Sequence, residues 1–269
     1  MSKAKAFLVA VSMVPFALGA QNLIKNGDAE ADLENWQPDK VQVVTENARS
    51  GKKCFKTSTA AVGTDIIPID GTVKYKYSVW VKSADNKKTD VYLALIPLDA
   101  DKVQINSQEI SAATETETEL AEACKAEDTV VKVKDAGKWK LANNIDVIAF
   151  NVLDDCKDLP NRNISPVVKK IENKNNVWEL TLEKPCGKAY PAGTKIRKHR
   201  YCSTYIYPAV LSQFNSNEWK ELSGEIKGVS KSGEAGDQFW AGTKFVKVDL
   251  FPLGGGTIYF DDWKLEEQK

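Results

Sequence analysis

The chain of 269 residues has a single histidine, His199, and none of the short motifs that carry nucleophilic, zinc-dependent or phosphate chemistry. The patterns G-x-S-x-G, H-E-x-x-H and G-x-x-x-x-G-K do not occur in it. A Ser-His-Asp hydrolase or a histidine-rich zinc site would have to use His199. That residue stands in the basic run Arg197 to Arg200, which is typical of the protein surface. The sequence therefore indicates a protein that is not an enzyme.

An excess of positive charge is also missing, since 37 Lys and Arg residues stand against 37 Asp and Glu residues. Proteins that bind nucleic acid or an anionic membrane surface concentrate basic residues. We expect neither partner. Beyond residues 1–20, no apolar run approaches the roughly 18 residues that a membrane-spanning helix needs.

The first twenty residues have the pattern of a secretory signal peptide. Lys3 and Lys5 precede an apolar stretch that runs to Leu18, and the small residues Gly19 and Ala20 follow. Removing residues 1–20 leaves 35 basic and 37 acidic residues. We expect an exported protein, extracellular or periplasmic.

Long apolar stripes of helical period are absent, and short alternating runs take their place. Val73 to Val81 alternates strictly, and Phe245 to Leu250 alternates again. Val91 to Leu95 is predicted to be the strand that follows Val73 to Val81. Runs of this length between Gly, Pro, Asn and Asp turns predict an all-β sandwich or barrel.

Cysteines help to divide the chain. Cys124 and Cys202 flank a segment of short strands that contains Cys156 and Cys186, while Cys54 lies outside it. The segment 123–200 is predicted to be a small β-barrel-like domain inserted into a loop of the sandwich. The simplest nested pairing joins Cys124 to Cys202 and Cys156 to Cys186. Five cysteines allow fifteen ways of making two bridges, so the pairing stays open.

The two ends of the exported chain carry matching signatures. Asn22 to Glu30 reads N-L-I-K-N-G-D-A-E, and Gly256 to Leu265 reads G-T-I-Y-F-D-D-W-K-L. Each is a short apolar strand with carboxylates at one end, which suggests termini that meet in space. This bracket resembles the secreted jelly-roll carbohydrate-binding modules of the family 4/9/22, galactose-binding-like group. The resemblance covers roughly 21–122 and 201–269.

The resemblance implies one jelly-roll β-sandwich built from 21–122 and 201–269 and interrupted by the inserted domain. It also implies a structural calcium ion with Glu30, Asp261 and Asp262 as side-chain ligands. Oxygen ligands of this kind suit Ca²⁺. The residues alone also allow another interpretation, in which Glu30 and Asp261 bind no metal and are ordinary carboxylates, one in a turn and one at the end of a strand.

A sugar-binding face needs exposed aromatic rings with polar groups beside them. Trp80 lies opposite Tyr75, Tyr77 and Val79 in the alternation of its strand, and Tyr92 lies opposite Val91 and Leu93. We predict that Trp80 and Tyr92 point outward and form a platform for the ligand. Trp240 is a third candidate member of this platform. Each ring could equally be packed in a small satellite core.

These observations predict noncatalytic binding of a polysaccharide or oligosaccharide, with secreted glycan-degrading enzymes as candidate partners. Two other classes stay open. One is a structural or adhesive cell-envelope protein that uses the sandwich as a scaffold, since fold does not dictate function. The other is a glycoside hydrolase or lyase, or its accessory protein, with a site that the sequence does not reveal.

Overall fold

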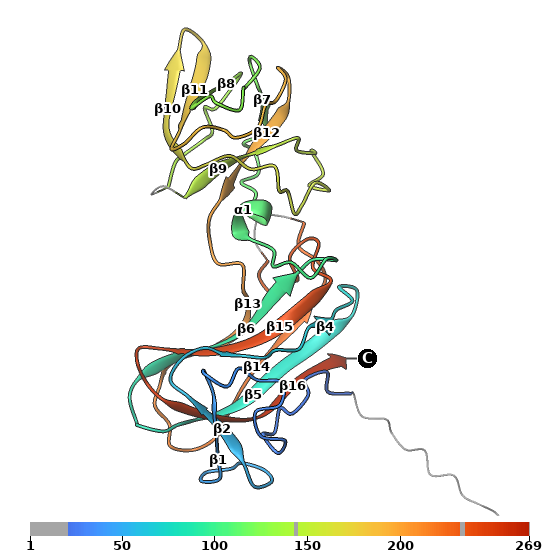
Figure 1. The fold of residues 1–269 in the computed structure, drawn as a ribbon, viewed down its shortest axis with the longest axis vertical. Coiled ribbons are helices and arrows are strands. Elements are labelled where there is room, and N and C mark those ends of the chain that lie inside the picture. Colours follow the sequence, from blue (N-terminus) through green and yellow to red (C-terminus); the bar gives the residue numbers. More distant parts are fainter. Residues whose placement is uncertain (1–20, 143–144, 232–234, 269) are drawn as a thin grey trace, which may run out of the picture.

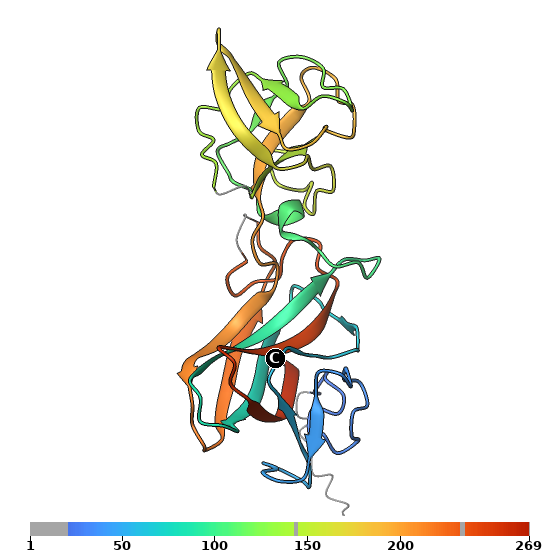
Figure 2. The ribbon, with the colours of Figure 1, turned by 60° about the vertical axis from the view of Figure 1, so that its left-hand side comes forward.

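The computed structural model describes residues 21–142, 145–231 and 235–268. The predicted signal peptide lies outside them. The chain forms two lobes stacked end to end, with the short helix α1 (Ser107–Ile110) between them (Figures 1 and 2). Apart from that helix, the described elements are antiparallel strands, which confirms the all-β prediction. Among the described residues, no helix has the length and apolar character needed to span a membrane.

The lower lobe in Figure 1 is a sandwich of two antiparallel sheets. Sheet I has the order β1 (Gln42–Val44), β2 (Cys54–Thr57), β16 (Ile258–Gln268), β5 (Lys74–Ser83) and β14 (Lys220–Lys227). Sheet II has the order β13 (Ile206–Phe214), β6 (Thr89–Leu98), β15 (Phe245–Leu253) and β3 (Ala61–Val62), and β4 (Ile67–Pro68) also pairs with β15.

Alternation of side chains builds the core between these sheets. On β5, Tyr75, Tyr77, Val79 and Val81 are all buried, as their period of two requires. The inward residues of β6 and β15 meet them in one continuous hydrophobic cluster. Consecutive strands β5 and β6 belong to different sheets, however, because the chain crosses the sandwich between them.

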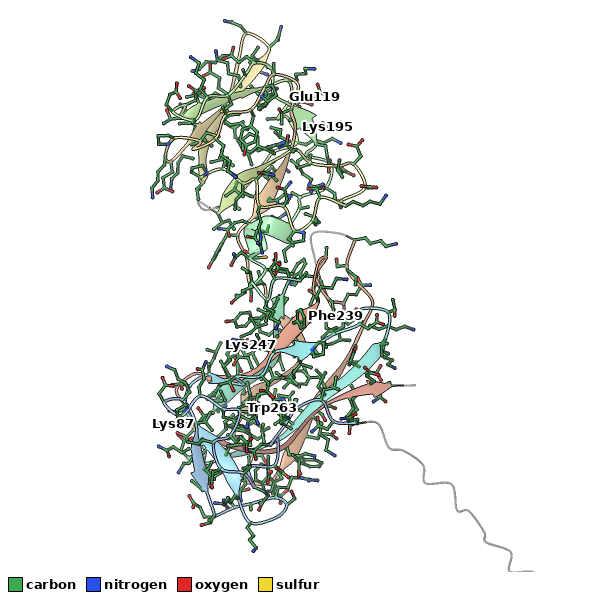
Figure 3. The ribbon with its side chains drawn as sticks, turned by 45° about the vertical axis from the view of Figure 1, so that its right-hand side comes forward. Lys87, Glu119, Lys195, Phe239, Lys247 and Trp263 are labelled. Carbon is green, nitrogen blue, oxygen red and sulfur yellow. The ribbon has the colours of Figure 1, made fainter. Side chains whose placement is uncertain are left out.

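The two termini meet, as the sequence suggested. The backbone N–H of Leu23 donates to the carbonyl of Leu265 at 2.8 Å, and the Asn22 side chain bonds the carbonyl of Trp263. Trp263 is fully buried and lies inside the sandwich (Figure 3). Gly27 has to be glycine here, since a Cβ would come within 2.2 Å of the Trp263 carbonyl oxygen.

The upper lobe is the insert, and its strands pair only with one another in the described sheets. One sheet has the order β10 (Val168–Lys174), β11 (Val177–Leu182) and β8 (Val130–Val133). The other has the order β7 (Thr118–Glu119), β12 (Lys195–Arg200) and β9 (Asp146–Phe150). The insert has its own hydrophobic core. It begins before residue 123, because β7 pairs with β12 in register Lys195 to Glu119.

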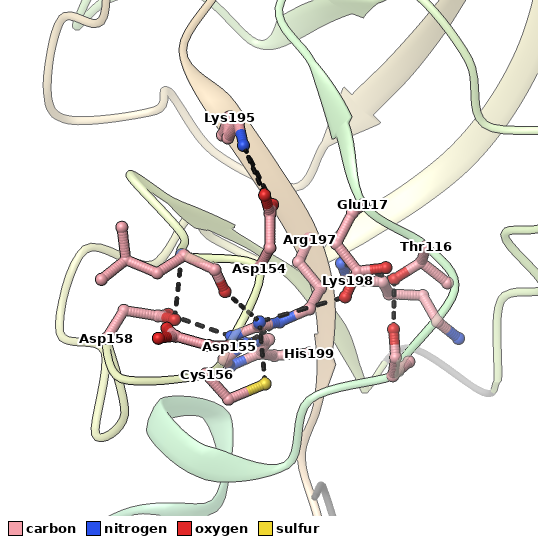
Figure 4. A network of polar contacts seen from close by, with 12 residues as sticks. Thr116, Glu117, Asp154, Asp155, Cys156, Asp158, Lys195, Arg197, Lys198 and His199 are labelled. Carbon is pink, nitrogen blue, oxygen red and sulfur yellow. Dashed lines mark hydrogen bonds and ion pairs between the residues drawn. The ribbon is translucent and has the colours of Figure 1, made fainter.

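An ionic network is buried in the insert (Figure 4). Arg197 on β12 is fully buried, and its guanidinium lies 3.0 Å from the Asp158 carboxylate. It also donates to the carbonyl of Leu153 and to the sulfur of Cys156. These bonds attach the irregular loop that follows β9 to β12. A buried arginine is tolerated because its donors are paired in this way.

His199 is buried as well, so the expectation of a surface residue was wrong. Its Nδ1 lies 2.7 Å from the carbonyl oxygen of Gln108, and Arg197 donates to its Nε2. Nδ1 must therefore carry the proton of a neutral ring. Burial, together with the charge of Arg197, lowers the pKa of His199 to about 4. The run of basic residues misled the prediction because two of them, Arg197 and Lys198, pair with Asp158 and Asp146 inside the lobe.

The cysteines are five free thiols in the structure. The thiol of Cys124 contacts that of Cys186, and both lie in the core of the insert. Cys202 is exposed, while Cys156 lies against Arg197. The nested pairing stays a prediction, and the structure brings together a different pair.

The low pKa of His199 leads to a prediction about pH. A folded-state pKa below the unfolded value of 6.5 destabilises the fold as pH falls, so the stability of the insert should decline between pH 6.5 and about 4. The full loss is on the order of 3 kcal/mol. The variant His199→Gln, which cannot take up a proton, should show a flatter profile in chemical denaturation at each pH. Equal slopes in both proteins would contradict this assignment.

Candidate functional site

Aromatic side chains gather on the outer face of sheet II. In the register of sheet II, Tyr92 of β6 pairs with Val210 of β13 on one side and with Phe251 of β15 on the other. The rings of Tyr92 and Phe251 stack at 5.1 Å with an interplanar angle of 9°. Both rings are half-buried, because their neighbours along each strand point the other way, into the core.

Two more tyrosines extend this surface at the start of β13. The Tyr207 ring lies 5.7 Å from that of Tyr92 and 6.0 Å from that of Phe251. The Tyr205 ring lies 6.2 Å from Tyr207 and 6.4 Å from Phe251. The Tyr207 hydroxyl is fixed by a 2.7 Å hydrogen bond with the hydroxyl of Ser203. We call Tyr92, Tyr205, Tyr207 and Phe251 the aromatic face.

A carboxyl group lies among these rings. Asp249 stands two residues before Phe251 on β15, so both point to the outer side of the sheet. Asp249 is only 2% exposed, and in the part of the chain that the structure describes its Oδ1 atom has no hydrogen-bond partner. Burial raises the pKa of Asp249 to about 7. Burial, and then the charge of Asp249, also raises the pKa values of Tyr205 and Tyr207, which shows that they lie near it.

A cavity of about 680 Å³ opens at the neck between the lobes. Tyr205 and Tyr207 line it, so it is continuous with the aromatic face. The other lining residues come from both lobes and from the neck: Ser111, Ala112, Ala113, Thr114, Arg200, Cys202, Ile206, Ala235, Gly236 and Trp240. The cavity thus combines apolar walls with a guanidinium and hydroxyl groups, as small-ligand sites do.

Of the predicted platform residues, Tyr92 and Trp240 lie in this region. Tyr92 is part of the aromatic face. Trp240 lines the cavity but is only 5% exposed, and its indole N–H donates to the carbonyl of Thr204 at 2.8 Å. It therefore forms a wall.

Trp80 lies elsewhere, on the outer face of sheet I. It points outward as its alternation predicted, but the guanidinium carbon of Arg49 lies 3.7 Å from its ring centre. Trp80 and Tyr92 belong to different sheets, so they do not form one platform. The prediction treated the strands containing them as neighbours in one sheet.

Sequence reasoning missed four residues of the site: Tyr205, Tyr207, Asp249 and Phe251. The alternation of Phe245 to Leu250 carried a signal for two of them, since it places Asp249 and then Phe251 opposite Val248 and Leu250. No comparable pattern marks the tyrosines, because their strand has irregular pairing between Ile206 and Ala209.

Two of the carboxylates that were predicted to bind calcium, Glu30 and Asp261, accept hydrogen bonds from the backbone of the loop at residues 49–53. Glu30 accepts the N–H groups of Lys52 and Lys53 at 2.7 and 2.9 Å. On the other side, Asp261 accepts the N–H groups of Arg49 and Ser50 at 2.9 and 3.2 Å. The backbone hydrogen bonds lower the pKa of Glu30, whereas burial raises that of Asp261 to about 6.

This donor set does not fit a cation as it stands. Asp262 pairs with the guanidinium of Arg49 and accepts from the Ser50 hydroxyl, and Lys53 pairs with Asp32. A positive side chain therefore already faces Asp262, and Lys53 lies beside Glu30. Within the part of the chain that the structure describes, no three His, Cys, Asp or Glu residues are grouped as metal ligands. No observation on this chain tests the calcium ion predicted from the sequence, and the contacts of these carboxylates argue against it.

Comparisons with known proteins give only distant likenesses. No family model and no curated protein matches the chain. Among solved structures, a family 16 carbohydrate-binding module is 15% identical with a TM-score of 0.41, and the match covers 91% of this chain and 99% of that one. The module TmCBM61, solved in complex with β-1,4-galactotriose, is 12% identical with a TM-score of 0.37, over 93% and 100%.

A third match is an N-terminal xylanase from Clostridium thermocellum, with its CBM22-1 and GH10 modules, in complex with xylohexaose. It is 11% identical with a TM-score of 0.39, over 88% of this chain and 27% of that one. These values are too low to assign the chain to a family.

The contacts of Glu30 and Asp261 lead to a prediction about metal. Because backbone N–H groups already satisfy Glu30 and Asp261, and Arg49 pairs with Asp262, thermal melts with EDTA and with millimolar calcium should coincide. The protein should first be shown to be metal-free by elemental analysis. A rise in melting temperature with calcium, absent in Glu30→Gln, would show instead that a cation stabilises the folded state by binding there.

Proposed function

We propose that the protein binds a polysaccharide or oligosaccharide, without catalysis, on the aromatic face and in the adjoining neck cavity. One observation carries the proposal: four half-buried aromatic rings share one face and lead into a cavity that has polar walls. The CH-rich faces of pyranose rings pack on such aromatic surfaces, and their hydroxyls need fixed donors and acceptors.

The insert supplies one side of this site. Arg200 follows directly on the buried network of β12, and its backbone N–H donates to the carbonyl of Ser111 at 3.0 Å. Residues 111–114 and Cys202 stand where the chain enters and leaves the insert, and they line the cavity. In this proposal the sandwich stacks the sugar, and the neck adds hydrogen-bonding groups.

The state of His199 supports binding without catalysis. It is fully buried, and both ring nitrogens are engaged, so it cannot exchange protons with a ligand in the cavity. We further propose that the sandwich is of jelly-roll type and that the protein acts outside the cytoplasm. The signal-like pattern of residues 1–20 supports that location.

An adhesive role is the second candidate, because apolar side chains border the aromatic face. Val210 lies beside Tyr92 and is 40% exposed, and Leu253 near the end of β15 is 51% exposed. Exposed apolar patches also serve protein contacts. Self-association abolished by Val210→Ser, without affinity for any glycan, would favour this role.

The test is affinity electrophoresis over soluble glucans, xylans, galactans and mannans. Tyr92→Ala should weaken binding about ten-fold, since a ring stacked on a sugar contributes roughly 1–2 kcal/mol by analogy with aromatic pairs. Trp80→Ala is the matched control, because that ring faces the other way under Arg49, and it should leave affinity unchanged.

Thermal melts of both variants show whether they remain folded. Weaker binding by Trp80→Ala, with full affinity in Tyr92→Ala, would move the site to sheet I. If the wild-type protein binds no member of the panel, the proposed function fails.

A further inference from the structure

The carboxyl group of Asp249 is buried with only part of the hydrogen bonding that buried polar groups normally have, since the Leu250 backbone N–H serves it but its Oδ1 atom is left without a partner among the described residues. In the register of sheet II, Asp249 stands across from Ala94 of β6 and Val62 of β3. Neither of these side chains can form a hydrogen bond. Within residues 21–142, 145–231 and 235–268, its Oδ1 atom has no hydrogen-bond partner, although the residue is 2% exposed. A buried acceptor in this state costs stability, and such groups often mark functional positions.

The surroundings of Asp249 contain few charges. On its own strand, Lys247 points to the same side two residues earlier. Tyr205 and Tyr207 approach from the segment that enters β13, and Tyr77 approaches from sheet I. Burial therefore raises the pKa of Asp249, the hydrogen bond from the Leu250 backbone offsets only part of that effect, and no ion pair with a described residue contributes. An apolar residue here would remove this cost and would leave the aromatic face in place.

We propose that Asp249 is a ligand-binding residue whose free Oδ1 accepts a hydrogen bond from a hydroxyl of an uncharged sugar stacked on the aromatic face. The inference rests on the proposed function. The inference deepens the proposed function in two ways: it names the residue that orients the ligand, and it names the class of glycan that binds. Above pH 7, where Asp249 is ionised, a sugar carboxylate would place a second anionic group beside it, so uronic acid polymers should bind more weakly than neutral glycans.

The experiment replaces Asp249 by leucine, which has the same branching and the same number of side-chain heavy atoms. Asp249→Leu should raise the melting temperature, because it removes an unsatisfied buried polar group, and it should weaken binding of neutral glycan at least ten-fold. Asp249→Asn keeps an acceptor oxygen and should lose less affinity. The stability gain of the leucine variant should be larger at pH 8 than at pH 5, since the charged form is the costly one.

The probes are soluble xylan, mixed-linkage β-glucan, β-1,4-galactan and polygalacturonate, measured by affinity electrophoresis and calorimetry. Unchanged affinity in Asp249→Leu, while Tyr92→Ala loses affinity, would overturn the role of Asp249 and leave the proposed function intact. A lower melting temperature in Asp249→Leu would show that the carboxyl group is structural. Tighter binding of polygalacturonate than of every neutral glycan would overturn the ligand class, and binding of none of the four probes would overturn both proposals.

Discussion

The alternation of side chains along β15 joins the stability of the sandwich to its candidate site. Every second residue, including Val246, Val248 and Leu250, enters the core between the sheets. The alternate residues of the strand, which include Asp249 and Phe251, lie on the outer side of the sheet. β15 pairs with β6, β3 and β4, so its register fixes much of sheet II. A shift of one residue would bury the carboxyl in the core and expose the apolar set.

The neck imposes the second constraint. The chain leaves the sandwich after β6, forms α1, passes through the insert and returns at β13. The ionic network of Arg197 and His199 ties the loop after β9 and the carbonyl of Gln108 in α1 to the same strand, β12. The insert and the neck are thereby connected through buried polar bonds, and the cavity lies where these two segments meet the sandwich. The site thus depends on both lobes.

The sequence predicted those features that depend on local periodicity or on the two chain ends. The alternation of Val73 to Val81 and the signature from Gly256 to Leu265 gave the strands β5 and β16, and the termini do meet. What it could not predict was which strands become neighbours. That is a long-range property, and the error paired Trp80 with Tyr92 across two different sheets.

The same limit applies to polar residues. His199 was expected at the surface because the partners that bury it, the carbonyl of Gln108 and an Arg197 side chain paired with Asp158, depend on contacts between segments distant in sequence. The carboxylates of Glu30 and Asp261 were interpreted as metal ligands, since the sequence does not show that the backbone of residues 49–53 supplies their donors. The alternation along β15 places Asp249 on the outer face, but the sequence does not show that its carboxyl group is buried there with an unpartnered oxygen among the described residues.

The most direct measurement uses Cys202, the one exposed thiol among the five and a residue that lines the cavity. The rate at which a bulky maleimide labels it should be followed with and without a saturating glycan, and Cys202→Ser should serve as the background control. If the ligand lies on the aromatic face and in the neck cavity, labelling should slow at least ten-fold. A glycan that binds by calorimetry but leaves the labelling rate unchanged would contradict the account.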